Sequence, residues 1–369
     1  MNKNKVITNM EQLTPEWLTN IFRNNGYLSH GSVTAISSKK TLSAISSNAH
    51  SLELIFSDDA KAEEVSSTII VKTPLPDEKF LGQHEAKFYS IVAKTMNKMP
   101  IPKCYDSVFS EETGLSHIIL ENLSKTHSEY GFFIPGVTPP PLKRYCERAI
   151  DCLAEIHAFW WDNPKLKDLS KHSYVLCTFK ENAFNEEEIS KWFKSQERFI
   201  DFLEDRVSNK RYELVKTIFS LFPHFAYERL TKENITIIHG DSHFWNFFYP
   251  KDIYNEKFKV YLTDWQMWGI GVGCQDLAYM LGLFFNLDDR HLVEKDLIKR
   301  YHNDLLTFGV KDYSLNDCWY DYKLLVLLNL YRIVWWWSLN VPPTEILRAL
   351  NIAMLNIEDL NCMDLLESK

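Results

Sequence analysis

The sequence IHGDSHFWN (residues 238–246), followed by LTDWQ (262–266), decides how the rest of this chain is interpreted. It places a carboxylate at Asp241, a carboxamide at Asn246 five residues later, and a second carboxylate at Asp264 eighteen residues further on. Mg²⁺ prefers oxygen ligands and is usually held by one or two protein groups together with phosphates and water. Asn246 and Asp264 are ligands of this kind, which leaves Asp241 to orient an attacking hydroxyl and accept its proton. The trio therefore predicts a site for phosphoryl transfer, which depends on positioning and on neutralising negative charge.

Short strands are predicted on both sides of a turn that separates the two motifs. Residues 235–238 and 260–263 are apolar runs with β-branched side chains, which are typical of strands. Residues 249–259 contain Pro, Asp, Asn and Lys, which favours an exposed hairpin turn. Taken singly, Asp241 and Asp264 could be turn residues and Asn246 a cap, so the prediction depends on the combination of the three.

The pattern resembles the aminoglycoside phosphotransferase and choline kinase-like superfamily, whose members are relatives of the protein kinases. The family's His-Gly-Asp-x4-Asn is matched by residues 239–246, and its Asp-Trp-Gln by residues 264–266. Residues 269–279 look like the family's continuation, in which an aspartate before Leu-Ala, here Asp276, braces the site. Residues 153–161 are similar to a family helix that ends in Leu-His-Ala. The resemblance is specific at the 239–246 loop and weak near the N-terminus.

The resemblance implies an α+β, protein-kinase-like fold of two lobes. A small N-terminal antiparallel sheet with one main helix is expected, followed by a large and mostly helical C-terminal lobe. Residues 131–141 are rich in Gly and Pro, so neither a regular helix nor a central strand fits them. We therefore expect a nucleotide-binding lobe at 1–122 and a catalytic and substrate-binding lobe at 123–369, with a helical insertion at about 162–228.

A lysine at the end of a predicted strand is the next candidate. Residues 68–72 (TIIVK) are strongly β-prone, and a buried lysine in a strand is unusual unless it is paired. The alternative is an exposed lysine at a strand end. The resemblance implies that Lys72 holds nucleotide phosphates and that a helix glutamate clamps it. Residues 82–92 are typical of an amphipathic helix, so Glu85 is the expected partner and Glu78 a rival.

The hairpin expected over the phosphates, residues 42–54, contains no glycine. Nucleotide kinases often carry a glycine-rich loop here, although members of the superfamily resemble this chain in having serine-rich versions. Ser46, Ser47 and Asn48 are therefore the candidate phosphate contacts, because small polar residues can form a tight turn and donate hydrogen bonds. An ordinary polar turn is the alternative.

The connector between the two predicted lobes is expected to contact the adenine ring. Residues 117–124 begin as an apolar strand and then turn polar. In a two-lobed kinase the base docks against backbone groups of this connector. The stretch that includes Glu121, Asn122 and Leu123 is the predicted contact.

Length and charge fit this interpretation. A chain of 369 residues exceeds the typical size of a single core, and a hydrophobic content of 45% is ample for a folded protein. The net charge of −8 argues against a general nucleic-acid binder and is compatible with a cationic small substrate.

No targeting signal is predicted. Residues 1–12 are polar and lack the apolar core of a signal peptide. The most apolar segment, 324–337, is interrupted by Asn329 and Arg332, so a buried helix is favoured over a membrane span. Seven cysteines without a Cys-x-x-Cys pair indicate neither a disulfide framework nor a zinc ribbon, and they favour a cytoplasmic location.

The second half of the chain is predicted to be largely helical. Periodicity predicts helices at 145–158, 186–207, 212–221, 274–285, 290–308, 315–329 and 343–358. Tryptophans crowd this half, and they can cage an ammonium group, stack on a sugar or fill a core. Only Trp265 and Trp268 are expected near the site, because they follow Asp264 closely in the sequence.

Two histidines are predicted to have structural roles. His239 is expected to bond to the backbone of its loop, and His157 to be a core histidine.

The predicted function is a Mg²⁺-dependent kinase. It would transfer the γ-phosphate of ATP or GTP to a hydroxyl of a small acceptor such as an aminoglycoside, a choline-like amino alcohol or another metabolite. A nucleotide-binding module without catalysis is the main alternative. A protein kinase fits less well, because Asp-Trp-Gln replaces Asp-Phe-Gly and no Ala-Pro-Glu segment is present. An unrelated helical scaffold with chance motifs is the third possibility.

Overall fold

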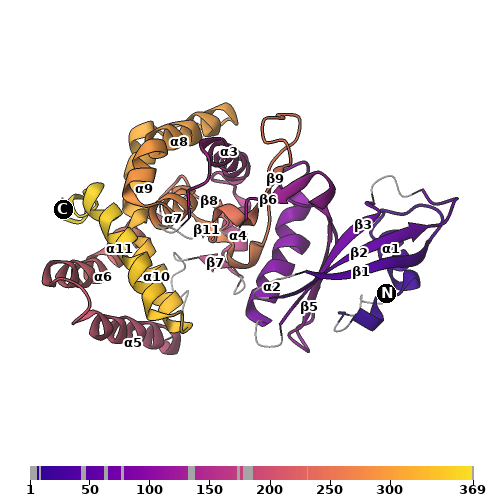
Figure 1. Ribbon diagram of the computed structural model, residues 1–369, viewed down its shortest axis with the longest axis horizontal. Helices are drawn as coiled ribbons and strands as arrows, with labels where there is room; N and C mark the ends of the chain where they lie inside the picture. The colour runs from indigo at the N-terminus through magenta and orange to yellow at the C-terminus, as the bar shows by residue number, and fades with distance from the viewer. Residues whose placement is uncertain are drawn as a thin grey trace. The chain divides into compact units, whose positions relative to one another are not determined.

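Each of the two units of this chain is built from two separate segments of the sequence. The structure is a computed structural model that describes residues 6–7, 10–42, 47–61, 65–75, 79–131, 138–172, 175–177, 186–230 and 232–367. The first unit comprises Met1–Glu129 and Phe248–Trp268, and the second comprises Tyr130–Phe247 and Gly269–Lys369. Figure 1 labels many of the helices and strands of each unit.

An antiparallel sheet of five strands forms the body of the first unit. Its order is β1-β2-β3-β5-β4. The strands are β1 (Val33–Leu42), β2 (Ser47–Phe56), β3 (Thr68–Pro74), β4 (Cys104–Phe109) and β5 (Ser116–Glu121). The predicted strand at 68–72 is β3, and Lys72 lies within it.

The two faces of β3 point to different helices. Side chains alternate along a strand, so Ile69 and Val71 share one face and Lys72 takes the other. Ile69 and Val71 are fully buried in a core with Leu18 and Phe22 of α1 (Pro15–Asn24). Lys72 forms an ion pair with a glutamate of α2 (Lys79–Lys87), which continues as a π-helical turn (Phe88–Val92). The alternation of side chains along β3 therefore places Lys72 on the face that α2 contacts.

A second, three-stranded sheet attaches a distant segment to the first unit. Its order is β10-β9-β6, with β6 (His127–Glu129) antiparallel to β9 (Phe247–Pro250) and with β10 (Tyr261–Leu262) on the far side of β9. The predicted hairpin around 249–259 connects β9 and β10. The predicted lobe division at residue 122 differs from this arrangement, because the first unit continues to Glu129 and includes Phe248–Trp268. Long-range strand pairing of this kind leaves no local pattern in the sequence.

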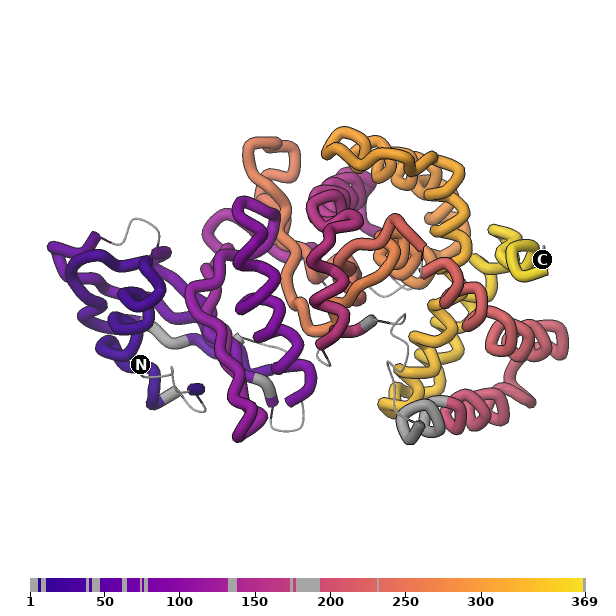
Figure 2. Tube along the Cα trace, turned by 180° about the vertical axis from the view of Figure 1, so that it is seen from behind, coloured from indigo at the N-terminus to yellow at the C-terminus, as the bar shows by residue number. Residues whose placement is uncertain are grey.

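The second unit is mostly helical. A short sheet of β7 (Leu176–Cys177), β11 (Gly269–Gly271) and β8 (Thr236–Ile238) accompanies the helices. The larger helices are α3 (Lys143–Trp160), α7 (Cys274–Phe284), α8 (Leu287–Thr307), α9 (Leu315–Val326), α10 (Leu328–Ser338) and α11 (Pro343–Asp359). Helix α7 is central because it is buried almost all round and contacts α9, α10 and α11. Helices α3 and α8 lie side by side, as Figure 2 shows from behind.

Two helices of the predicted insertion are α5 (Glu186–Leu203) and α6 (Asn209–Leu230). Helix α6 was predicted to end at residue 221, yet it continues through Pro223. A proline inside a helix costs about 3 kcal/mol or more. Burying one large apolar side chain contributes about 1.5–3 kcal/mol, and Phe219, Phe222 and Phe225 are all buried, so packing outweighs that cost.

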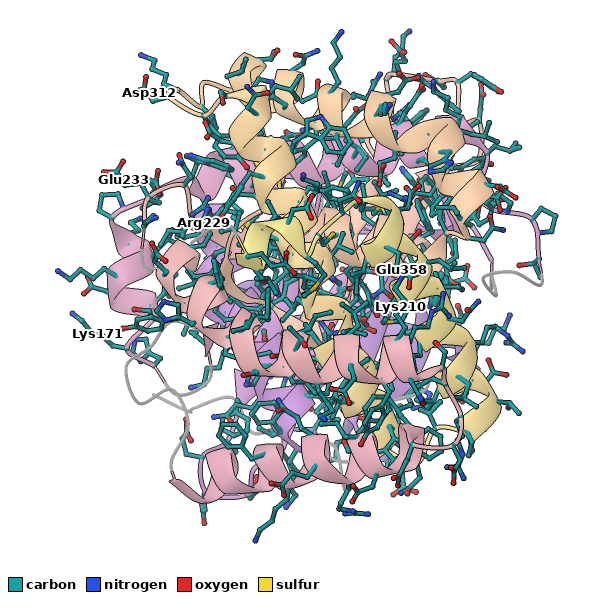
Figure 3. The ribbon with its side chains drawn as sticks, turned by 90° about the vertical axis from the view of Figure 1, so that its left-hand side faces the viewer. Lys171, Lys210, Arg229, Glu233, Asp312 and Glu358 are labelled. Carbon is teal, nitrogen blue, oxygen red and sulfur yellow. The ribbon has the colours of Figure 1, made fainter. Side chains whose placement is uncertain are left out.

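Ion pairs tie α6 to the rest of the second unit. Arg229, labelled in Figure 3, forms two hydrogen bonds of 2.5 and 2.6 Å with the carboxylate of Asp321 on α9. Arg211 pairs with Glu358 of α11 at 3.3 Å. A guanidinium that grips a carboxylate with two bonds fixes orientation as well as distance.

The apolar segment 324–337 forms two consecutive helices. Helix α9 ends at Val326 and α10 begins at Leu328. At the junction, the N–H groups of Leu327 and Leu330 donate to carbonyls three residues earlier, Leu324 O and Leu327 O, each at 3.3 Å. The predicted buried helix is therefore interrupted. Among the helices in the described part of the chain, none is long and apolar enough to cross a membrane.

Candidate active site

Three charged residues that are distant in sequence gather in the first unit. Lys72 Nζ lies 2.7 Å from Glu85 Oε2 and 2.5 Å from Asp264 Oδ1. Lys72 and Glu85 are largely buried, whereas 36% of the Asp264 side chain is exposed. Strand β3, helix α2 and the end of the β10 segment each contribute one member. Glu85 is thus the helix glutamate that contacts Lys72, and its rival Glu78 lies outside the described residues.

The two carboxylates keep Lys72 charged. Burial by itself would lower the pKa of Lys72, but Asp264 and Glu85 outweigh it and hold the pKa well above its ordinary value. Burial raises the pKa of Glu85, and the charge of Lys72 opposes that rise. A permanently cationic group with two anionic partners results. This is the type of group that can bind phosphate oxygens.

Two tryptophans hold the turn that carries Asp264. Asp264 has a left-handed backbone with φ of 64°, which costs about 1–3 kcal/mol in a non-glycine residue and persists only where the surroundings fix it. Trp265 stacks on Phe88 with ring centroids 4.0 Å apart and an angle of 6°. The Trp268 indole donates to His84 O at 2.9 Å. Both tryptophans are fully buried, so they anchor Asp264 and do not present a face to a ligand.

Asp276 organises the loop 239–242 in the second unit. Its carboxylate accepts the backbone N–H groups of His239 and Gly240 at 2.7 and 2.8 Å. Its own carbonyl accepts the Ser242 hydroxyl at 2.8 Å, and His157 Nε2 lies 3.2 Å from the carboxylate. Burial would raise the pKa of Asp276, but the bond and charge of His157 and the contacts with His239 lower it below its ordinary value. The buried carboxylate is therefore ionised and fixes the loop.

A second layer of contacts supports Asp276. His157 Nδ1 lies 2.8 Å from the hydroxyl of Tyr301, and both side chains are buried. Gly273 stands directly against them, because a Cβ atom at this position would lie 2.2 Å from the Tyr301 oxygen and 2.8 Å from His157 Nδ1. Only glycine allows this approach. His157 is thus a core histidine, as predicted, but one that also contacts the loop's brace.

The carboxylate of Asp241 has a close partner at Oδ1 and a more distant one at Oδ2. The Tyr279 hydroxyl donates to Oδ1 at 2.7 Å, and His243 Nε2 lies 3.4 Å from Oδ2. The Asp241 N–H donates to His239 Nδ1 at 3.3 Å, and Asn246 Nδ2 donates to the Asp241 carbonyl at 2.8 Å. Burial opposes ionisation, yet His243, Arg332 and Tyr279 together lower the pKa of Asp241 well below its ordinary value. An oriented and ionised carboxylate can accept a proton from a hydroxyl.

Sequence reasoning did not identify Tyr279 and Arg332 as site residues. Arg332 donates a hydrogen bond to Gly240 O, and its guanidinium lies 4.9 Å from the centroid of the Tyr279 ring. Two signals were present in the sequence. Tyr279 follows Asp276 by three residues, which places both on one face of a helix. Arg332 is a charge inside an otherwise apolar helix, where an unpaired charge is disfavoured.

The predicted phosphate loop differs from the structure in part. Ser46 lies outside the described residues. Ser47 and Asn48 belong to strand β2 and pair with Pro74 and Thr73. They therefore do not lie in a turn, and Ser47 is buried while Asn48 is exposed. Neighbouring side chains on a strand point to opposite faces, so Ser47 and Asn48 face opposite sides of β2, and their contact with nucleotide phosphates stays a prediction.

The predicted adenine connector lies where β5 ends. The N–H of Glu121 donates to Lys103 O at 2.9 Å, and the N–H of Asn122 donates to Thr68 O at 3.3 Å. The Asn122 side chain accepts from Ser124 N at 2.9 Å and caps a short 3₁₀ turn, Leu123–Lys125. These N–H groups are already used within the unit, and a base contact at 121–123 stays a prediction.

The two predicted metal ligands belong to different units, Asp264 to the first and Asn246 to the second, so their joint ligation of a metal stays a prediction. In the described part of the chain, no three His, Cys, Asp or Glu side chains form a group that could hold a metal ion. Mg²⁺ needs only one or two protein oxygens. The donor types of Asn246 and Asp264 fit that requirement.

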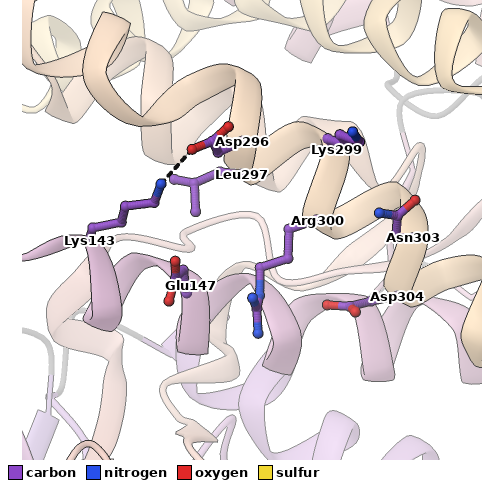
Figure 4. A pocket seen from close by; sticks show the side chains of 8 residues that line it. All are labelled: Lys143, Glu147, Asp296, Leu297, Lys299, Arg300, Asn303 and Asp304. Atoms are coloured by element: carbon purple, nitrogen blue, oxygen red, sulfur yellow. Dashed lines mark hydrogen bonds and ion pairs between the residues drawn. The ribbon is translucent and has the colours of Figure 1, made fainter.

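A charged groove of about 410 Å³ lies between α3 and α8, and none of the predicted site residues line it. Figure 4 shows its lining, which is Lys143, Glu147, Asp296, Leu297, Lys299, Arg300, Asn303 and Asp304. Arg300 bonds to both oxygens of Asp151 at 2.5 and 2.9 Å. Burial and the neighbouring Asp151 raise the pKa of Asp304 to about 7.

One protein family matches most of the chain. The model described as "Ecdysteroid kinase-like family" matches residues 46–311. No curated protein matches the sequence.

Solved structures show the same fold at low sequence identity. A microcompartment-associated aminopropanol kinase is 12% identical, with a TM-score of 0.54 over 89% of this chain and 94% of its own. An ethanolamine kinase from Plasmodium vivax is 10% identical, with a TM-score of 0.54 over 99% of this chain and 92% of its own. The GDP complex of wild-type aminoglycoside 2′-phosphotransferase-IIIa is 13% identical, with a TM-score of 0.51 over 93% and 98%. The predicted fold class and superfamily are confirmed.

Proposed function

The chain belongs to the ecdysteroid kinase-like family, and on that premise we propose that it transfers the γ-phosphate of ATP or GTP to a hydroxyl of a small molecule. The observation that carries this proposal is the geometry that holds the carboxylate of Asp241. Its Oδ1 is held by Tyr279, and its loop is fixed by the bonds from His239 and Gly240 to Asp276. A fixed anion of this kind is what a transfer to an alcohol requires, because the acceptor proton must leave as the new bond forms.

The proposed roles divide between the two clusters. Asp241 orients the acceptor hydroxyl and takes its proton. Lys72, held by Glu85, neutralises nucleotide phosphates, because its positive charge is maintained despite burial. Asn246 and Asp264 would hold Mg²⁺, which when bound would neutralise charge on the transferring phosphate. The Asn246 amide is already oriented by its bond to the Asp241 carbonyl, so its oxygen is directed away from that bond.

The acceptor is proposed to be a small hydroxylated molecule, which could be cationic. The names of the similar structures include aminopropanol, ethanolamine and aminoglycoside kinases, and the name of the matching family includes ecdysteroids. These names provide a first panel of acceptors. The free cysteines of the described residues are compatible with the cytoplasmic location proposed from the sequence.

The test is release of ADP or GDP that depends on both Mg²⁺ and an acceptor from this panel. Wild type and Asp241→Asn are compared, because the substitution keeps the shape of the side chain and removes its charge. Acceptor-dependent turnover by wild type alone supports the proposal. Nucleotide binding, seen as a rise in melting temperature, without turnover on any acceptor would favour the nucleotide-binding module.

A further inference from the structure

Tyr279 contacts the residue that we propose as the proton acceptor, Asp241. It lies on α7 one turn after Asp276, and its ring is buried. Its hydroxyl stands 2.7 Å from Asp241 Oδ1. Burial keeps the phenol protonated, with its pKa well above the ordinary value, so the tyrosine is the donor and the aspartate the acceptor.

The two oxygens of Asp241 are therefore different. Rotation about the bond to a carboxylate is nearly free, so an aspartate without partners presents either oxygen in many orientations. The short bond from Tyr279 fixes Oδ1. Oδ2 has the weaker contact, because His243 Nε2 lies 3.4 Å away, beyond the usual range of a strong charged hydrogen bond. Oδ2 is the oxygen left for an incoming hydroxyl.

Arg332, on a separate helix, contacts both the loop that carries Asp241 and the ring of Tyr279. On α10, it donates to the carbonyl of Gly240, the residue before Asp241. Its guanidinium also lies over the Tyr279 ring, 4.9 Å from the centroid. A planar guanidinium can stack and donate at the same time, which a lysine ammonium cannot reproduce. Phe284 packs edge-on against the same ring at 5.1 Å and limits its movement.

We propose that Tyr279 and Arg332 are positioning residues for the phosphate transfer, which fix Asp241 so that Oδ2 receives the proton of the acceptor hydroxyl. In the transfer step, the acceptor oxygen bonds to the γ-phosphorus, the bond from that phosphorus to the β,γ-bridging oxygen breaks, and the acceptor proton moves to Oδ2. Tyr279 keeps its own proton throughout. The inference depends on the proposed function, because it assigns two further residues to the same site.

Tyr279→Phe is the direct test, because it removes one oxygen atom and keeps the ring under Arg332. We expect kcat to fall roughly 10- to 100-fold, which is less than the loss of about 10²–10⁴-fold expected when the proton acceptor itself is removed. The KM values for nucleotide and acceptor should change little. Arg332→Met should also lower kcat, and Arg332→Lys should recover only part of the loss because it restores charge without the planar stack.

Tyr322→Phe is the matched control. Its hydroxyl donates to Glu294 at 2.6 Å in the buried interior of the same unit, so the substitution removes the same kind of bond. It should lower the melting temperature and leave kcat unchanged. A kcat loss of equal size in the control would show that Tyr279 acts only through stability and would overturn the inference.

A double variant separates the inference from the proposed function. In an Asp241→Asn background, adding Tyr279→Phe should cause no further loss, because the two groups act on one step. If wild type transfers phosphate and Asp241→Asn does not, yet Tyr279→Phe keeps full kcat, the positioning role is wrong and the function stands. If Asp241→Asn keeps full turnover, the assignment of the base itself fails.

Discussion

The carboxylates of the two charged clusters in this protein have different kinds of partner. In the first unit, one ammonium group, Lys72, is shared by the side chains of Glu85 and Asp264. In the second, the buried carboxylate of Asp276 accepts hydrogen bonds from the backbone N–H groups of His239 and Gly240, and His157 Nε2 lies 3.2 Å from it. Side-chain ion pairs can change partners when a ligand arrives, whereas backbone donors cannot move without moving the loop.

This difference indicates how the two clusters will respond to substitution. The first contains one cation and two anions, so it carries a net charge of −1 and has a partly exposed member in Asp264. Changes there should alter nucleotide binding more than folding. The second is buried, and its carboxylate accepts main-chain N–H groups. Changes at Asp276 should therefore alter folding and activity together. Substitution of Asp241 should have a third kind of effect. The residue is anchored by the fixed loop, but its own carboxylate carries out the proposed chemistry, so activity should change more than folding.

The largest expected effect is that of Asp241→Asn on turnover. Removing the proton acceptor should lower kcat by about 10²–10⁴-fold, while the melting temperature and nucleotide affinity stay close to those of wild type. Steady-state kinetics and thermal unfolding with and without nucleotide measure both quantities. A large loss of stability in this variant would mean that Asp241 belongs with Asp276 as a structural group.

Asp276→Ala should give the largest loss of stability. It leaves two buried N–H groups without an acceptor, at a cost of about 1–3 kcal/mol for each. Activity should be lost together with a clear fall in melting temperature. Asp317→Ala is the control, because Asp317 also accepts a backbone N–H, from Ser314 at 3.0 Å, but at the exposed start of α9. Similar losses from the two variants would remove the contrast between buried and exposed main-chain bonds.

Glu85→Gln tests whether the first cluster governs nucleotide binding. Glutamine can still accept a bond from Lys72 but no longer fixes it by charge, so Asp264 becomes the only anionic partner. We expect the nucleotide KM to rise roughly tenfold, equivalent to about 1.4 kcal/mol, with a small change in melting temperature. Glu111→Gln, which removes the exposed partner of Lys87 in the same unit, should change neither quantity. An unchanged nucleotide KM in Glu85→Gln would argue against this division of roles.

The groove between α3 and α8 contains a third group of charges, for which we expect a smaller effect. Here two carboxylates, Asp151 and Asp304, lie beside the guanidinium of Arg300. The pKa of Asp304 is raised to about 7, so its proton is bound more tightly in the folded state than in the unfolded state, where the ordinary pKa is about 4. Stability should therefore fall as pH rises from about 4 to about 7.

Asp304→Asn removes this dependence. The variant should melt at a higher temperature than wild type at pH 8, and the difference should shrink as the pH approaches 4. Thermal unfolding across this pH range measures the effect. An equal shift at every pH would show that the charge of Asp304 is not responsible.

The sequence alone determined the parts of this protein that depend on local pattern. The β-prone run TIIVK predicted the strand that carries Lys72, and the spacing of the loop residues identified Asp241, Asn246 and Asp264 as candidates. Periodicity also located the long helices to within a few residues at most ends, because burial of one face repeats along a helix at a fixed interval.

Only the tertiary structure decided which distant groups meet. The pairing of β6 with β9, the continuation of α6 through Pro223 and the strand position of Ser47 and Asn48 depend on long-range contacts. So do the bonds from Tyr279 to Asp241 and from Arg332 to Gly240. Local preferences are set by neighbours within one or two turns, whereas these contacts join segments that are far apart in sequence and are selected by packing of the whole unit.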